Sequence, residues 1–150
     1  MKKAMETYEP NSRIPIPHDC VIKDIRQESD WLIIDFEDDI SRHDSIRAIR
    51  PDARTLTLRF HLIYDGIQGI FRHRRSQRDG AGYMPVKGFR QFRKLMRNSR
   101  HSETFLYLYE AYHQVIVELD STLLMLETDS VEFEWTLKEP ADAVEADPVL

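Results

Sequence analysis

The sequence predicts an α+β fold that consists mainly of antiparallel β-sheet, with about six or seven strands and one helix near residues 85–99. Residues 55–64 and 131–137 alternate apolar and polar side chains, which is the period of a strand with one dry and one wet face. The spacers between strand-like stretches are short, and this favours antiparallel neighbours because parallel strands need long crossovers.

The chain has 150 residues, which suits one domain, and we expect that domain to span 18–138. Residues 1–17 contain three prolines and are expected to form an irregular lead-in. Residues 139–150 are acidic and poor in large apolar groups, which predicts a disordered tail. The sequence has neither a secretory signal nor an apolar run of the roughly 20 residues that span a bilayer, so the expected location is the cytoplasm and no membrane partner is expected.

In the first half of the chain, residues 20–26 and 31–37 predict a hairpin, because the four polar residues between them suit a turn. Residues 46–50 are a further strand-like stretch before 55–64, across a turn that contains Pro51. The side chains expected on the dry face of 55–64 are Leu56, Leu58, Phe60, Leu62 and Tyr64.

Residues 65–84 interrupt this pattern, because four glycines and a cluster of arginines predict a long loop. Pro85 fits the first turn of a helix that is expected to run to about Arg100. Phe89, Phe92 and Met96 recur there at helical spacing.

The remaining elements are expected to be strands. Residues 105–119 are aromatic and β-branched, although their 107–112 part is also compatible with a helix. Two separate strands are expected at 122–127 and 131–137, and Val131, Phe133, Trp135 and Leu137 form the dry face of the second.

Charge is sorted along the chain. Residues 1–71 carry a net charge of −3, residues 72–101 carry +9 and residues 102–150 carry −11, within a total of −5. This acidic balance argues against a protein that coats nucleic acid with its whole surface.

The basic segment has two interpretations. Its helical part places Arg90, Arg93, Lys94 and Arg97 on a face opposite the apolar residues. These side chains could contact phosphates, because guanidinium groups match phosphate oxygens and a basic stripe releases counterions from nucleic acid. They could equally form a solvated face that meets the acidic strands of the same fold, and no aromatic residues interleave with them for base stacking.

The acidic residues of the last strands are the candidate contact for a protein partner. They are Glu127, Asp129, Glu132 and Glu134. They could meet a basic partner, or they could serve only as polar groups on an exposed sheet face.

Catalytic and metal sites are not predicted. The pairs His18–Asp19 and His43–Asp44 each offer an imidazole and a carboxylate, but neighbouring residues on a strand point to opposite faces and do not converge on one ion. Cys20 is the only cysteine, which excludes an intrachain disulfide, and as the start of an apolar strand it is expected to be buried.

Two further motifs lack the features of a catalytic or metal-binding site. The acidic cluster of residues 35–39 lacks the glycine and the spacing of a calcium loop. The glycines of 66–69 and 80–82 are not followed by the Gly-Lys-Ser/Thr of a phosphate-binding loop. We therefore expect no enzyme activity, no metal and no cofactor.

Both ends of the predicted domain carry a family resemblance. Residues 18–25 (His-Asp-Cys-Val-Ile-Lys-Asp-Ile) and 31–36 (Trp-Leu-Ile-Ile-Asp-Phe) resemble the start of small uncharacterised bacterial β-rich proteins, and 129–135 (Asp-Ser-Val-Glu-Phe-Glu-Trp) is similar to their last strand. Some proteins of this kind are immunity proteins, which neutralise a toxin by binding it. The resemblance implies no site residues, and the basic middle of the chain has no counterpart in it.

The sequence thus predicts a non-enzymatic protein-binding domain, and the resemblance implies its specific form, an immunity protein that neutralises a bacterial toxin by direct binding. An acidic protein suits a basic toxin, because complementary charge speeds their encounter. The alternative is a nucleic-acid-associated protein that binds through residues 72–97. A third class, a metal-dependent hydrolase built on His18, His43 and the acidic cluster, would require bound metal.

Overall fold

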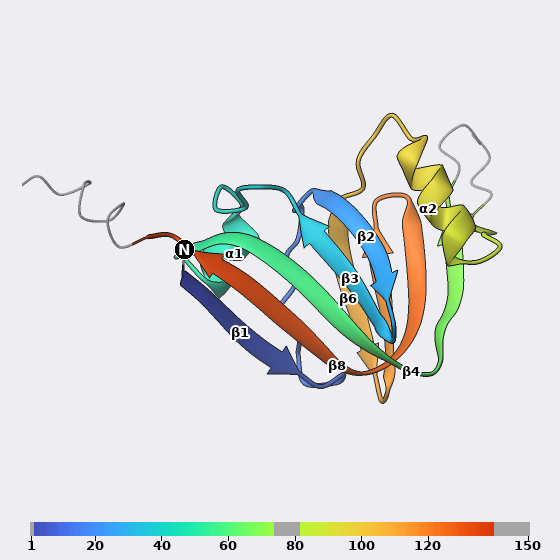
Figure 1. Cartoon of the computed structure of the whole chain (residues 1–150), viewed down its shortest axis with the longest axis horizontal. Helices are drawn as coiled ribbons and strands as arrows, with labels where there is room; N and C mark the ends of the chain where they lie inside the picture. Colours follow the sequence, from blue (N-terminus) through green and yellow to red (C-terminus); the bar gives the residue numbers. More distant parts are fainter. Residues whose placement is uncertain (1, 74–81, 140–150) are drawn as a thin grey trace, which may run out of the picture.

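The structure, a computed structural model, describes residues 2–73 and 82–139. Eight strands and two short helices form a mainly antiparallel sheet, which confirms the predicted α+β class (Figure 1). The strands are β1 (Lys2–Tyr8), β2 (Ile22–Glu28), β3 (Trp31–Phe36), β4 (Ala53–Arg72), β5 (Met84–Pro85), β6 (Phe105–Ala111), β7 (Gln114–Leu119) and β8 (Thr122–Leu137). The helices are α1 (Asp44–Ile49) and α2 (Phe89–Arg97). Within these described ranges, no helix has the length and apolar character needed to cross a membrane.

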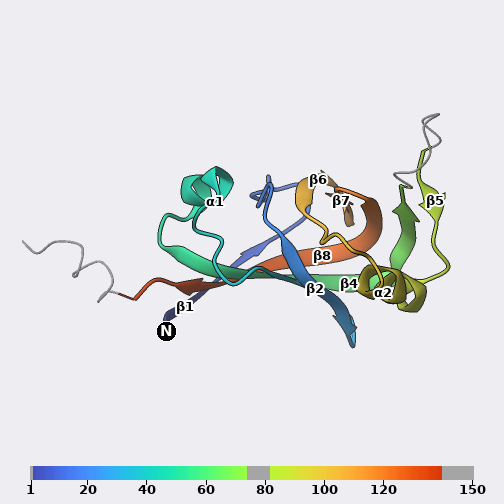
Figure 2. The same cartoon turned by 90° about the horizontal axis from the view of Figure 1, so that it is seen from above.

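Two long strands, β4 and β8, form the centre of the sheet and pair along most of their lengths. The strand order is β2-β3-β4-β8-β7-β6, and every pair in it is antiparallel. The edge of β8 that faces away from β4 has two partners. β7 pairs with the first part of β8, and β1 pairs with residues 131–137. Figure 2 shows α1, β6 and β7 on the same side of the layer that β4 and β8 form.

The sheet also closes on itself at one end, along a seam between residues 20–22 and 103–105. Val21 and Thr104 form an antiparallel bridge there. The Ile22 N–H donates to the Glu103 carbonyl (2.8 Å), and the Phe105 N–H donates to the Cys20 carbonyl (3.0 Å). The seam joins the first and last strands of the sheet order, so inward side chains from all of its strands face one interior.

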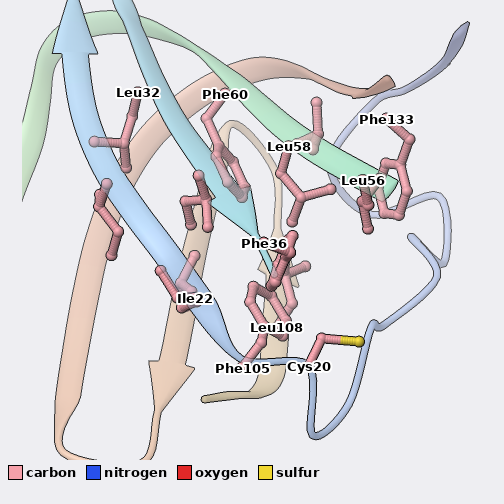
Figure 3. Close-up of a cluster of buried hydrophobic side chains, with 14 of the residues drawn as sticks. Cys20, Ile22, Leu32, Phe36, Leu56, Leu58, Phe60, Phe105, Leu108 and Phe133 are labelled. Atoms are coloured by element: carbon pink, nitrogen blue, oxygen red, sulfur yellow. The ribbon is translucent and has the colours of Figure 1, made fainter. Parts of the chain in front are cut away.

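The core confirms the predicted dry faces of β4 and β8. Their buried members are Leu56, Leu58, Phe60, Leu62, Val131, Phe133, Trp135 and Leu137. Figure 3 shows Phe60 from β4 and Phe36 from β3 pointing toward the cluster that also holds Phe105. Cys20 is fully buried at its edge, as predicted.

Tyr64 is the exception to the predicted dry face, because 81% of it is exposed. The register between β4 and β8 jumps from Leu62 opposite Thr128 to Ile67 opposite Leu126, so β4 carries extra residues at this point. Tyr64 and Gly66 both have a positive φ, 52° and 66°. This bulge turns Tyr64 out of the alternation on which the prediction depended.

The N-terminal lead-in was predicted to be irregular, and this is wrong for residues 2–8, which form β1. Its inward Glu6 accepts hydrogen bonds from the Trp135 indole N–H (2.8 Å) and the Tyr8 hydroxyl (2.8 Å), and its carboxylate lies 3.1 Å from an Arg50 nitrogen. All three prolines of the segment follow this strand and so do not prevent it.

The next residues of the lead-in are held by one side chain. The Glu110 carboxylate of β6 accepts hydrogen bonds from the backbone N–H groups of Asn11 (2.7 Å), Ser12 (3.1 Å) and Ile14 (2.8 Å). A carboxylate that accepts several backbone N–H groups fixes a segment that has no regular structure of its own. Residues 140–150 of the predicted tail lie outside the described residues.

Four other predictions need correction. Residues 44–49 form α1, so the strand predicted at 46–50 is wrong. The strand predicted at 55–64 is part of β4, which continues past the bulge to Arg72, well into the predicted loop. Residues 105–119 form the β6–β7 hairpin, so the helical interpretation of 107–112 is wrong. The two strands expected at 122–127 and 131–137 are one strand, β8. The predicted helix is present as the shorter α2, with Phe92 fully buried.

Candidate protein-binding surface

The curled half of the sheet, made by β6, β7 and the ends of β4 and β8, carries apolar side chains on its outward face. In β7, Val115 and Val117 point inward, so Ile116 and Glu118 point outward. The register aligns the outward residues in two rows: Tyr109, Ile116, Met125 and Gly69 in the first, and Tyr107, Glu118, Leu123 and Phe71 in the second. We call the six large apolar members of these rows the aromatic face: Phe71, Tyr107, Tyr109, Ile116, Leu123 and Met125.

The aromatic face is ordered by contacts within it. The Tyr107 and Tyr109 rings lie 4.9 Å apart, and the Tyr109 hydroxyl donates to Glu118 at 2.9 Å. This hydrogen bond raises the pKa of Tyr109, so the phenol stays neutral. Tyr107 and Tyr109 nevertheless remain 47% and 50% exposed, and they present half of each ring to solvent.

Gly69 makes room in the first row for a ring from the second. A Cβ atom at this position would lie 2.8 Å from Cε2 of Phe71 and 3.7 Å from the Met125 sulfur. The Phe71 ring therefore lies over the glycine and next to Met125, and it extends the apolar surface from β8 onto β4.

Two carboxylates border the aromatic face. Glu118 lies within its second row, and Glu127 lies beyond the first row, opposite Gln114. The Oε1 atom of Glu127 is buried and has no hydrogen-bond partner among the described residues. A buried carboxylate oxygen without a donor is an unfavourable arrangement within the fold.

The outward face of the other half of the sheet is polar and already paired. Arg59 lies 3.6 Å from Glu132 and 5.0 Å from the centre of the Trp31 ring. Asp35 pairs with Arg26 and accepts a hydrogen bond from the Thr57 hydroxyl (2.8 Å). These side chains satisfy one another within the chain, in contrast to the aromatic face.

His61 joins the polar half to the β2–β3 turn. One ring nitrogen lies 2.7 Å from Asp129 and the other 2.8 Å from Asp30, so the ring bridges two carboxylates. The hydrogen bonds to Asp129 and Asp30 raise the pKa of His61, and the bond to His61 lowers the pKa of Asp30. The arrangement favours an imidazolium that links β4 to β8 and to the turn.

The structure separates the four acidic residues predicted to bind a partner. Glu132 and Glu134 lie on the polar half, and Asp129 is bound to His61 beside it. Glu127 alone borders the aromatic face. Sequence reasoning missed the exposed tyrosines, although the alternation within residues 105–119 would have placed Tyr107 and Tyr109 together on one face.

The basic residues of α2 are also divided. Arg93 turns toward β2, where it donates to the Ile25 carbonyl (2.8 Å) and lies 3.5 Å from Asp24. Arg90, Lys94 and Arg97 are exposed, and none of them has a hydrogen bond or an ion pair with the described residues. Of the predicted stripe of four, three cations are therefore free of partners in the part of the chain that the structure describes.

The histidine and cysteine candidates do not assemble into a site. His18 contacts Asp19 (3.4 Å), while His43 contacts Glu37 (3.1 Å). Burial, followed by the charge of Glu37, raises the pKa of the Cys20 thiol to about 12, so it is not a nucleophile near neutral pH. No group of three or more potential metal ligands occurs in the described ranges.

Comparisons with known proteins give no functional assignment for this chain. The chain matches no protein-family model, and neither a curated protein nor a solved structure matches it.

Proposed function

We propose that this chain is a non-enzymatic protein-binding domain that docks a partner on the aromatic face. The observation that carries the proposal is the pair of aligned outward rows in which apolar side chains, two tyrosines among them, remain partly exposed. Contiguous exposed apolar surface is typical of interaction sites, and tyrosine is among the residues enriched in binding hot spots.

The chemistry of the surface favours a partner that carries Lys or Arg side chains beside apolar ones. Glu118 and Glu127 supply negative charge at the aromatic face, and tyrosine rings accept cations on their faces. The overall net charge of −5 adds long-range attraction for a basic protein. An immunity protein that binds a basic toxin is the specific form of this proposal, and it is suggested by the sequence resemblance.

The double substitution Tyr107→Ala and Tyr109→Ala is expected to weaken partner binding by about 100-fold, because two hot-spot tyrosines together contribute on the order of 2.7 kcal/mol. The partner would be captured from native lysate at low salt after nuclease treatment, identified by mass spectrometry and measured by calorimetry. Both rings are about half exposed, so the double variant should keep its fold.

Tyr112→Ala is the matched control, because Tyr112 is 80% exposed and lies in the β6–β7 turn, beyond the aligned rows. It should bind the same partner with unchanged affinity. Equal binding by the double variant and the unsubstituted protein would remove the aromatic face as the docking surface.

A nucleic-acid-binding role is the second candidate, and it is favoured by the three cations of α2 that have no partner among the described residues. It predicts that changing Arg90, Arg93, Lys94 and Arg97 together to Ala lowers affinity for a short duplex by at least about tenfold at 50 mM salt and flattens its salt dependence. Fluorescence anisotropy across a salt series would measure both quantities. If the quadruple variant and the unsubstituted protein bind DNA and RNA equally, this candidate is excluded.

A further inference from the structure

One edge of β4 lacks a strand neighbour over part of its length. On the β3 side, pairing stops at His61, and the Leu62 N–H donates to the Asp30 carbonyl (2.7 Å). Pairing resumes where the Ile70 carbonyl accepts a hydrogen bond from the N–H of Val86 (2.8 Å), the residue directly after β5. Among the described residues, no strand pairs with the intervening 63–69 on this edge.

A groove of about 520 Å³ lies along this open edge, between the β2–β3 turn and the start of α2. Its volume falls within the range of about 300–1,000 Å³ that is usual for ligand sites. Leu62, Ile67, Ile70, Val86 and Phe89 supply its apolar lining. In Figure 1 the elements that form it lie at the opposite end of the sheet from α1.

Acidic and basic side chains lie at different parts of the groove. Two carboxylates, Asp30 and Asp65, line it, and its lining within the described residues contains neither Lys nor Arg. Asp65 has no hydrogen bond or ion pair with the described residues. At the α2 side the groove continues, past Phe89, into a shallower hollow lined by Arg90 and Arg93.

We propose that an extended peptide segment of a partner protein binds in this groove by adding a strand to the open edge of β4. The segment places a Lys or Arg side chain at Asp65, an apolar side chain against Phe89 and Val86, and an acidic side chain toward Arg90. Its backbone supplies the hydrogen bonds that β3 and β5 supply on either side of the gap. This site is separate from the aromatic face and extends the proposed function to a second surface.

Selection of displayed random peptides on the immobilised full chain would test the proposal, followed by synthesis of the enriched peptides. We expect enriched peptides to combine a basic residue, an apolar residue and an acidic residue in that spatial order. Methylating single backbone nitrogens should weaken binding by about tenfold at alternate positions only, because a strand hydrogen-bonds to one neighbour through every second residue.

Charge reversal provides the matched pair of protein variants. Asp65→Lys should weaken peptide binding by at least about tenfold, whereas Asp44→Lys, at an exposed acid on α1, should leave it unchanged. The double variant of Tyr107 and Tyr109 should also bind the peptide normally, so that failure of this site and failure of the aromatic face are distinguishable. No enrichment, or binding that is insensitive to both N-methylation and Asp65→Lys, would overturn the proposal.

Discussion

The protein is expected to lose stability as the pH rises from 4.5 to 7, and Glu103 is the cause. This side chain lies at the seam and is only 4% exposed. Burial, together with a hydrogen bond to Asp120, raises the pKa of Glu103 from 4.5 to about 7. The Ser121 N–H (3.1 Å) and the Thr122 hydroxyl (3.2 Å) also donate to its carboxyl group.

The sign follows from the proton balance. Above pH 4.5 the unfolded chain releases the Glu103 proton, whereas the folded protein keeps it until about pH 7. The unfolded state therefore binds fewer protons in this window, and stability falls as the pH rises. The raised pKa corresponds to a loss of about 3 kcal/mol by the upper end of the window.

Glu103→Gln should remove this dependence, because an amide keeps the acceptor oxygen and the shape of the side chain but does not ionise. Urea unfolding from pH 4.5 to 8 would measure the effect, and the variant should be the more stable protein at pH 8. Glu118→Gln, at the aromatic face, is the control and should keep the slope. The slope of stability against pH below pH 6 is the diagnostic quantity. His61 also contributes stability through its raised pKa, but this contribution falls only above pH 6.5. A flat profile for the unsubstituted protein over that range would contradict the prediction.

Glu6→Ala is expected to lower the free energy of unfolding by about 3 kcal/mol, because one carboxylate serves three partners. The substitution leaves the fully buried Trp135 without an acceptor for its indole N–H and leaves Arg50 without its contact to β1. Burial is the main cause that raises the pKa of Tyr8 to about 12, and the hydrogen bond and charge of Glu6 are the next causes. The substitution removes both Glu6 contributions.

Two measurements test this result. Urea unfolding gives the change in stability, and titration of the tyrosine absorbance should show that the pKa of Tyr8 falls. Glu6→Gln is the matched variant, because it retains an acceptor oxygen for Trp135 and should lose less stability than Glu6→Ala. Equal stability of Glu6→Ala and the unsubstituted protein would show that β1 does not depend on this carboxylate.

The parts of the fold that sequence predicted best are those in which one side-chain period fixes one face. Leu56, Leu58 and Phe60 alternate without interruption, and the structure buries all three. The prediction failed where the structure of a segment is determined by a contact with a residue that is distant in the sequence. Nothing within residues 2–8 shows that Glu6 meets Trp135, and nothing near residue 11 shows that Glu110 will bind its N–H.

The availability of the candidate site residues could not be predicted from the sequence, for a related reason. Charge in the sequence points to Glu132 and Asp129, but in the structure Glu132 pairs with Arg59 and Asp129 with His61. Whether a charged group is available depends on register, which composition does not reveal. The aromatic face depends on three strand pairings and on a glycine that admits the Phe71 ring, so it becomes visible only once the sheet is assembled.

The sharing of β8 between β4 and β1 has a consequence for the order in which the protein is built. Residues 131–137 are the pairing partners of both β1 and the first part of β4, so two strands that a ribosome makes early must wait for one that it makes late. Contacts so distant along the chain are slow to form, because the long loop between them must close first. We expect the nascent chain to stay open, with the edges of β1 and β4 accessible to chaperones, until β8 has emerged.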